Sequence, residues 1–240
     1  MSEEFCYLII GNGKLANHLC YYFAHLKIRF FHWYRNKNND NVTQLHSLLK
    51  KVSHVIVAIT DSQVDDFIES HIPDGYYNQK TFIHCSGSLL SKYAFTAHPL
   101  QTFAPTLYSF DDYLKIPFII EYEGPSFSEL LPGLGNVHYK IQRQDKHYYH
   151  ALCVMANNFT TLLWQKFFLE TNSRFKMQKK DVLPFLEQTF TNIANNDFEA
   201  FTGPLARKDV DTIKNDLNSL QGDNFHYVFE SFVKAFNIKV

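Results

Sequence analysis

Short apolar runs alternate with amphipathic stretches along the first 141 residues of the chain. The runs at 5–10, 28–34, 55–59, 81–84 and 95–98 predict buried strands, and 117–123 and 136–141 predict two more. Apolar residues at helical spacing predict helices at 14–26, 42–50 and 63–70. Because strands that alternate with helices form parallel sheets covered on both faces, we expect an α/β fold with a doubly wound, mostly parallel sheet.

The pattern changes after Gln142. Between 143 and 202 there is no glycine, and Pro184 is the only proline. An apolar stripe predicts one long helix over 143–170, and Asp181 fits an N-cap that places Pro184 in the first turn of the next helix. Further helical patterns lie at 209–220 and 224–236. We therefore expect two domains, an α/β domain at 1–142 and an all-helical domain at 143–240.

Composition and charge exclude several classes of protein. The 240 residues are 45% hydrophobic and carry a net charge of −1, so no basic field attracts nucleic acid or anionic lipid. No apolar run reaches the roughly 18 residues that span a bilayer, and the acidic start Met1–Glu4 does not have the pattern of a signal peptide. The four cysteines are scattered, as in reduced proteins. We expect a cytoplasmic protein with a small-molecule ligand.

The first predicted strand ends in a turn of the form G-x-G-x-x-A, made of Gly11, Asn12, Gly13, Lys14, Leu15 and Ala16. Between a strand and a helix, this turn is typical of the dinucleotide-binding Rossmann domain. Gly11 permits the sharp turn, Gly13 lets a pyrophosphate approach the backbone, and Ala16 lets the helix pack closely on the sheet. The helix N-terminus offers N–H groups to the phosphates. The alternative is an ordinary strand–turn–helix with two glycines.

The end of the second strand favours NADP over NAD. NAD-binding domains usually have an acidic residue here, whereas this chain has Arg35, with Lys37 close behind. A guanidinium binds phosphate through two hydrogen bonds at once; the alternative is a solvated arginine in a polar loop. Two further loops, after the third and fourth strands, are expected to face the cofactor or to cap helices. They contain Thr60, Asp61 and Ser62, and Cys85, Ser86 and Gly87.

Six segments resemble Rossmann-like proteins that carry the domain of unknown function 2520, relatives of pyrroline-5-carboxylate reductase, prephenate dehydrogenase and 6-phosphogluconate dehydrogenase. The segments lie at 11–16, 84–87, 98–103, 149–151, 156–158 and 202–209, in family order across nearly the whole chain. The HPLQTF segment at 98–103 and the TGPLAR segment at 202–207 are the specific ones. Lys208 stands where the family usually has Gly, and Asn157 stands where it usually has Ser.

The resemblance implies NADP(H) binding and a homodimer joined through the helical domain. One branch of the family looks like the alternative ketopantoate reductase of bacteria that lack the usual enzyme of pantothenate synthesis. Reduction of 2-dehydropantoate (ketopantoate) to pantoate is therefore the leading hypothesis. The alternatives are another NADP-dependent oxidoreductase, acting on an imine or a hydroxy acid, and a non-catalytic NADP(H)-binding sensor.

A reductase of this kind needs a proton donor beside the carbonyl oxygen. His150, early in the predicted long helix, is the first candidate because imidazole exchanges protons near neutral pH. A helix histidine bonded to a backbone carbonyl is the alternative. Lys146, one turn earlier, is the second candidate. Asn157 and Asn158 follow His150 by seven and eight residues, so regular helix geometry favours Asn157 on its face, whereas the family pattern points to Asn158.

Other polar residues are expected to bind substrate; together with Asn157 they are His98, Asn192, Thr202, Gly203 and Arg207. His98 contacts substrate or fixes a loop made rigid by Pro99. Arg207 clamps a carboxylate or pairs with Asp209, which we expect to cap a helix. No set of residues has the spacing of metal ligands, and no G-x-S-x-G motif indicates a serine hydrolase. We expect no metal site.

Overall fold

The computed structural model describes residues 5–35, 42–77 and 79–237, without the side chains of 196–198. The chain folds as two compact units, residues 1–160 and 161–240. The first unit extends past the predicted domain end at 142 because the helix that follows anchors its first turn, through the buried Lys146, to Glu121 of the sheet. The functional roles assigned to the two predicted domains stay predictions.

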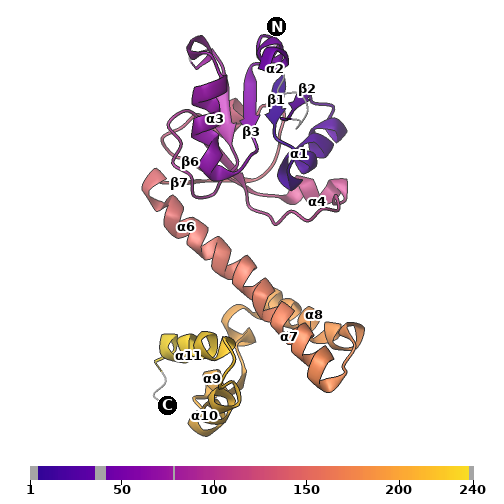
Figure 1. The fold of residues 1–240 in the computed structure, drawn as a ribbon, viewed down its shortest axis with the longest axis vertical. Helices are drawn as coiled ribbons and strands as arrows, with labels where there is room; N and C mark the ends of the chain where they lie inside the picture. The colour runs from indigo at the N-terminus through magenta and orange to yellow at the C-terminus, as the bar shows by residue number, and fades with distance from the viewer. Residues whose placement is uncertain (1–4, 36–41, 78, 238–240) are drawn as a thin grey trace. The chain divides into compact units, whose positions relative to one another are not determined.

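The first unit is built on a seven-stranded sheet with strand order β2-β1-β3-β4-β5-β6-β7 (Figure 1). The strands are β1 (Tyr7–Ile10), β2 (Phe30–Trp33), β3 (His54–Val57), β4 (Thr81–His84), β5 (Phe95–Pro99), β6 (Phe118–Glu121) and β7 (His138–Ile141). Neighbouring strands are parallel except β5 and β6, which are antiparallel. The predicted α/β class and the mostly parallel sheet are confirmed.

Helices cover both faces of this sheet. They are α1 (Lys14–His25), α2 (Val42–Leu49), α3 (Val64–His71), α4 (Phe110–Lys115) and α5 (Phe127–Leu130). Alternate residues of β1 enter different cores: Tyr7 and Ile9 pack with α1, α4 and α5, whereas Leu8 and Ile10 pack with α2 and α3. The sequence pattern did not predict α4 and α5, because helices of one turn or so carry too few residues for a visible apolar period.

The chain leaves the sheet through a helical path that is not a uniform α-helix. It consists of α6 (Lys146–Cys153), a π-helical segment (Val154–Phe159) and α7 (Thr160–Phe175). The helix predicted at 143–170 therefore has nearly the right ends, but the prediction of one regular α-helix was wrong. A π turn holds one residue more than an α turn, and such turns are frequent at functional sites.

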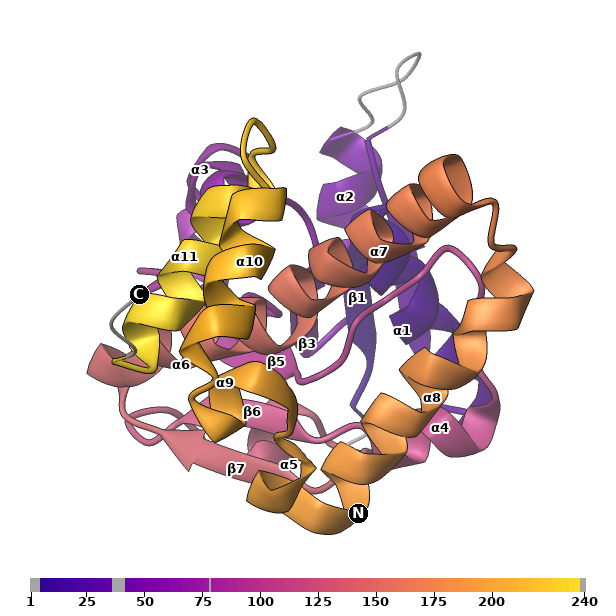
Figure 2. The same cartoon turned by 90° about the horizontal axis from the view of Figure 1, so that it is seen from below.

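The second unit continues with α8 (Lys179–Asn196), α9 (Gly203–Arg207), α10 (Val210–Ser219) and α11 (Phe225–Ala235), and α10 and α11 lie side by side (Figures 1 and 2). Its small core contains Ile213, Leu217 and Val233. Asp181 was predicted to be an N-cap, but it lies in the first turn of α8, which begins at Lys179. An acidic side chain is also favourable in that turn, because the helix dipole is positive there.

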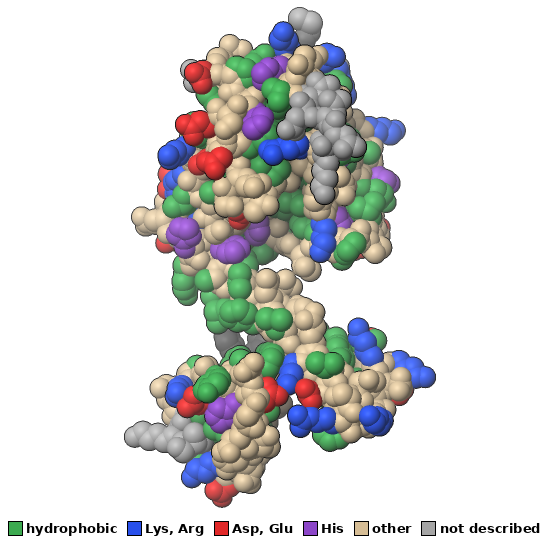
Figure 3. Space-filling model, in the orientation of Figure 1, with side chains coloured by type: hydrophobic (Ala, Val, Ile, Leu, Met, Phe, Trp, Pro, Cys, Tyr) green, Lys and Arg blue, Asp and Glu red, His purple; other side chains and the backbone are tan. Residues whose placement is uncertain are grey.

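Hydrophobic side chains are exposed along much of the helical part of the chain (Figure 3). In the second unit they include Leu162, Leu169, Phe175, Phe185, Phe190, Tyr227 and Phe232. Exposed apolar surface of this extent marks an interaction face. Among the described residues, none of the helices combines the length and the apolar character that a membrane crossing requires.

Candidate cofactor and active site

The glycine turn joins β1 to α1 at the point where the strand order reverses, between β1 and β3. Gly11 has φ of +127°, and a Cβ built there would lie 2.2 Å from the carbonyl oxygen of Ala58, which directly follows β3. Gly11 also donates its N–H to the Trp33 carbonyl at 2.9 Å, and its own carbonyl lies 2.6 Å from His32 Nε2. Only glycine fits this position, so Gly11 has the role in the turn that the sequence predicted.

The turn leaves space in front of the helix N-terminus. Gly13 is the N-cap residue of α1, no side chain caps this end, and a Cβ built on Gly13 meets nothing within 4 Å. Ala16 is fully buried against the sheet, which brings α1 close to it. A bare backbone at an uncapped helix N-terminus fits a phosphate, so these residues fit a dinucleotide.

Arg35 follows β2 on the same edge of the sheet and is exposed, next to the half-exposed Tyr34. Lys37, the second cation of the NADP prediction, lies outside the described residues. The position of Arg35 one strand away from the glycine turn is that of a residue that reads the adenosine ribose. Its contact with a 2′-phosphate stays a prediction.

The loops after β3 and β4 are tied together. The Ser86 hydroxyl donates to the Asp61 carboxylate at 2.5 Å and accepts the N–H of Leu89 at 3.0 Å. Thr60, Asp61 and Ser62 are exposed where a short 3₁₀ turn begins, and Thr60 makes no side-chain cap. Burial raises the pKa of the Cys85 thiol to about 12, so it stays protonated at neutral pH and is not a nucleophile.

Two histidines converge on Gly87, in the loop after β4. A Cβ built on Gly87 would lie 3.0 Å from His150 Cδ2 and 3.3 Å from His98 Nε2. His98 comes from the end of β5 and His150 from α6, so the fold brings together residues far apart in the sequence. The two candidates thus share one site, with a glycine between them that leaves room for both rings.

Tyr149 belongs to the same group, although the sequence analysis did not single it out. Its hydroxyl lies 2.8 Å from His98 Nδ1, and the two rings meet edge to face with centroids 5.6 Å apart. Burial lowers the pKa of His98 to about 4, with smaller effects of the charges of His150 and Lys146, so His98 is neutral at pH 7. The available signal was the segment 149–151, one of the six that resemble the family, but His150 was its only residue predicted to lie in the site.

Lys146 does not join this group, so its predicted role as a proton donor is not supported. Its side chain is fully buried, and its ammonium donates to Glu121 Oε1 at 2.9 Å and to Thr96 and the Leu89 carbonyl. Arg143 binds the other Glu121 oxygen at 2.8 Å. Burial lowers the pKa of Lys146 despite the opposing hydrogen bond and charge of Glu121. All of its polar contacts lie within the protein, which leaves none for a substrate.

A buried chain of contacts links Lys146 to the loop after β4. Thr96 donates to Glu121 at 2.7 Å and lies 3.2 Å from His84 Nε2, while His84 Nδ1 accepts the Ser86 N–H at 3.2 Å. Burial, and next the charge of Lys146, lower the pKa of His84 to about 3, so it is neutral. The start of α6, which carries His150, is therefore fixed to the loop that carries Gly87.

Asn157 and Asn158 both lie in the π segment, are exposed, and are joined by a hydrogen bond of 3.1 Å from Asn157 Nδ2 to Asn158 Oδ1. The extra residue of the π turn moves the eighth residue after His150 toward the place that the seventh holds in a regular α-helix. The π turn therefore brings Asn158, which the family pattern indicates, toward the face of His150, and the role of either asparagine stays a prediction.

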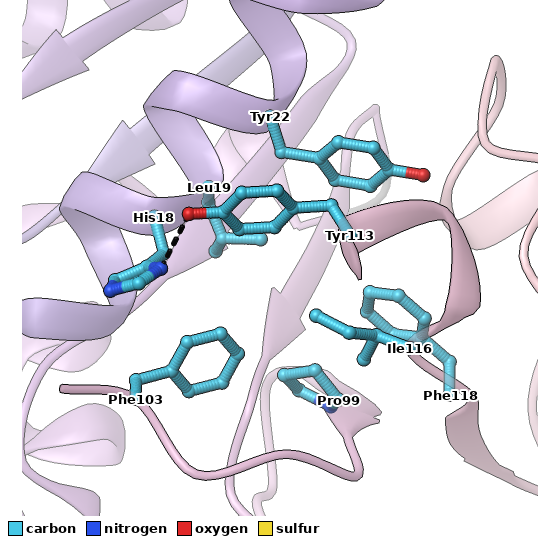
Figure 4. A pocket seen from close by; sticks show the side chains of 8 residues that line it. All are labelled: His18, Leu19, Tyr22, Pro99, Phe103, Tyr113, Ile116 and Phe118. Atoms are coloured by element: carbon cyan, nitrogen blue, oxygen red, sulfur yellow. Dashed lines mark hydrogen bonds between the residues drawn. The ribbon is translucent and has the colours of Figure 1, made fainter. Parts of the chain in front are cut away.

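The cavity in Figure 4 is not this site. It lies between α1, α4 and the segment after β5, has a volume of about 10 Å³ and is lined by apolar groups, so it has room for no more than one water. His18 beside it lies 2.6 Å from the Tyr113 hydroxyl and donates Nε2–H to the Ala104 carbonyl at 2.9 Å. These bonds fix the chain just beyond the HPLQTF segment to α1.

The remaining predicted residues lie in the second unit, where each has a local role. Asn192, on α8, accepts a hydrogen bond of 2.6 Å from Gln188. Thr202 is the N-cap residue of α9, Gly203 has φ of +88°, and Arg207 ends that helix. Lys208 has the left-handed φ of 55°, a conformation that favours glycine, which is the residue that the sequence resemblance implies there. Their contact with substrate stays a prediction, whereas Asp209 caps α10, as expected.

The fold and the glycine turn define a Rossmann-type protein with a helical C-terminal part. The sequence profile of the family described as domain of unknown function (DUF2520) matches residues 121–235. Residues 121–235 are therefore similar to this domain, and the resemblance found in the sequence is confirmed. A comparison with curated proteins found no match.

Solved structures with the same fold cover almost the whole chain. A protein of Bacteroides fragilis, named as a candidate NADP oxidoreductase, has 21% identity and a TM-score of 0.75, covering 99% of each chain. Pyrroline carboxylate reductase of Plasmodium falciparum, solved with NADP bound, has 13% identity and a TM-score of 0.54, covering 97% of this chain and 96% of its own. An imine reductase of Streptomyces aurantiacus has 13% identity and a TM-score of 0.62, covering 97% and 93%. At these identities the likeness concerns the fold.

Proposed function

We propose that the protein is an NADP(H)-dependent reductase of a small 2-oxo acid, with ketopantoate as the leading substrate and pantoate as its product. The convergence of His98 and His150 on Gly87, beside the loops of a dinucleotide-binding turn, is the observation that carries this proposal. The structural neighbours named as NADP oxidoreductase, pyrroline carboxylate reductase and imine reductase support a nicotinamide-dependent reductase. The choice of ketopantoate rests on the sequence resemblance.

The residues at the carboxyl ends of β1 to β4 would hold the cofactor. Gly11, Gly13 and the N-terminus of α1 receive the phosphates, and Arg35 binds the 2′-phosphate. The tied loops at 60–62 and 85–87 border the ribose and the nicotinamide. When bound, NADPH supplies the hydride that reduces a carbonyl carbon, and a proton delivered to the oxygen completes the alcohol.

The protein's own groups then deliver the proton and hold the substrate. His150 gives a proton to the carbonyl oxygen and takes up another from solvent. Asn158 orients the carbonyl group from the π segment. In the second unit, Arg207 is the group proposed to pair with a substrate carboxylate through two parallel hydrogen bonds, with Asn192, Thr202 and Gly203 as further substrate-binding candidates. Lys146 and Glu121 keep α6 in place beneath His150.

The test is NADPH oxidation by the purified full chain across a panel of 2-oxo acids that includes ketopantoate, and of cyclic imines. We expect one 2-oxo acid to be consumed, and His150→Ala and Arg207→Ala to lower turnover while NADPH affinity stays nearly unchanged. His147→Ala is the matched control, because His147 is exposed on the same helix, three residues earlier. Turnover that is unaltered in both site variants would contradict the assigned roles.

The same panel separates the alternatives. Consumption of an imine alone would indicate an imine reductase, a class to which two structural neighbours belong. Saturable NADPH binding without consumption of any carbonyl compound or imine would indicate a sensor. Either result would overturn the 2-oxo acid assignment while leaving the cofactor site intact.

We further propose a homodimer joined through the helical part, supported by its exposed Leu169, Phe185 and Phe190. Sedimentation at several concentrations tests it, and a monomer at all of them would contradict it. We also propose a reducing, cytoplasmic location, since the four cysteines are thiols rather than disulfides.

A further inference from the structure

Tyr149 contacts one of the two site histidines on the side away from Gly87. Its hydroxyl lies 2.8 Å from His98 Nδ1, whereas His98 Nε2 is 3.3 Å from the Cβ position of Gly87. Within the described part of the chain, Nε2 has no hydrogen-bond partner, and no fully buried side-chain nitrogen or oxygen lacks one. Nε2 is therefore accessible at the site, while Nδ1 is bound inside the protein.

The hydrogen-bonding capacity of the neighbours decides where the His98 proton lies. The Tyr149 hydroxyl has one proton, and His98 Nδ1 is its hydrogen-bond partner among the described residues. If Nδ1 carried the ring proton, the Tyr149 O–H would have no acceptor there, whereas an imidazole nitrogen without a proton is a good acceptor. The favoured bond therefore runs from the Tyr149 O–H to His98 Nδ1.

We propose that Tyr149 is a positioning residue that holds His98 in its neutral Nε2–H form, so that Nε2 donates a hydrogen bond to the carbonyl oxygen of the substrate. This inference rests on the proposed reductase function. A neutral donor polarises the carbonyl group without transferring its proton, which leaves proton delivery to His150. The two histidines that meet at Gly87 then have different roles, set by their different surroundings.

The first test needs neither cofactor nor substrate. Long-range ¹H–¹⁵N spectra of the histidine rings distinguish Nε2–H from Nδ1–H, and the signals lost in His98→Gln identify His98 among the twelve histidines. We expect Nε2–H in the wild-type protein, a shift toward Nδ1–H in Tyr149→Phe, and no change in Tyr148→Phe. Tyr148 is the matched control because it is the neighbouring tyrosine on α6 and is 70% exposed. A wild-type proton on Nδ1 would overturn the proposal, even if Tyr149→Phe fails to fold.

The second test measures turnover with the carbonyl substrate found in the panel. Tyr149→Phe should lower kcat by roughly ten- to a hundredfold with KM changed by less than about twofold, because the lost effect operates on the developing alkoxide. Equal kcat in Tyr149→Phe and the wild type would refute donation by His98. If the wild-type protein binds NADPH but reduces nothing, the proposed function fails together with donation, while the spectra still decide the tautomer.

Discussion

Lys146 and Glu121 form an ion pair inside the first unit, with Nζ and Oε1 2.9 Å apart and both side chains almost wholly buried. The pair joins the first turn of α6 to the end of β6. Burial would raise the pKa of Glu121, but hydrogen bonds from Lys146 and Thr96 and the charges of Lys146 and Arg143 bring it below its usual value. The Glu121 carboxyl is therefore ionised at neutral pH, while burial lowers the pKa of Lys146, and the two groups depend on each other to offset their lost hydration.

Replacing Lys146 by methionine should destabilise the protein, because Glu121 keeps a buried charge with only Arg143 beside it. We expect a loss of about 3 kcal/mol in the free energy of unfolding, measured by urea denaturation. Lys115→Met is the control: Lys115 is 76% exposed and pairs with Asp112 at the surface, so its loss should be below about 1 kcal/mol. Equal losses in the two variants would show that the buried pair does not anchor α6.

Stability should fall with acid because of His84 and His98. Their pKa values are lowered, mainly by burial, to about 3 and about 4, whereas an unfolded histidine has a pKa of about 6.5. Below about pH 6.5 the unfolded chain therefore binds protons that the folded protein does not. Above that pH these two histidines do not lower the free energy of unfolding. Below it, the free energy of unfolding decreases by about 1.4 kcal/mol per pH unit for each histidine until the folded pKa is reached.

Urea denaturation at pH 7, 6 and 5 measures this slope before most carboxylates titrate. His84→Gln should reduce this slope by the amount that corresponds to about one proton taken up on unfolding. His147→Gln, at an exposed position, should leave the slope unchanged. Stability that is constant between pH 7 and pH 5 would contradict the burial of these two rings in neutral form.

Arg35→Asp should change the cofactor preference. Removing a charge-assisted hydrogen bond to the 2′-phosphate and adding a carboxylate near the ribose should lower the ratio of NADPH to NADH affinity by roughly ten- to a hundredfold. Lys115→Asp makes the same change of charge at an exposed site on α4 and should leave the ratio as it is. The same ratio in Arg35→Asp and the wild type would show that Arg35 does not read the phosphate.

Gly87→Ala tests the spacing of the two histidines. The added methyl group would press on His150 at 3.0 Å and on His98 at 3.3 Å, so one ring must move. Because small displacements of catalytic groups are costly, we expect turnover to fall by roughly ten- to a hundredfold in a folded protein. Gly135→Ala should have no effect, since a Cβ there meets nothing within 4 Å. Full activity in Gly87→Ala would place the reaction elsewhere.

The sheet could be predicted from the sequence because its strands are short, almost continuously apolar runs such as Tyr7–Ile10, buried on both faces. The glycine turn was visible because its function requires a particular residue at each position. Local pattern could not show the π turn at Val154–Phe159, since one inserted residue leaves the apolar stripe nearly unchanged.

Pairings between distant residues were also out of reach. Lys146 and His150 lie one turn apart on α6, and both were predicted to be proton donors. What separates them is Glu121, 25 residues earlier, at the end of a buried strand. The strand Phe118–Glu121 is an apolar run that ends in the acidic Glu121, and this was a signal that a buried cation would lie opposite. The contact of Tyr149 with His98, across 51 residues, left no comparable trace.

The most direct test of the account is a calorimetric titration of the full chain with NADPH. It compares the wild type, Gly13→Asp and Gly75→Asp. A Cβ at Gly13 or at Gly75 meets nothing within 4 Å, so both variants should fold, but only the first places a carboxylate where the phosphates are expected. We predict saturable binding by the wild type and Gly75→Asp, and loss of binding in Gly13→Asp. No saturable binding by the folded wild type, or unchanged binding by Gly13→Asp, would contradict a dinucleotide site at the glycine turn.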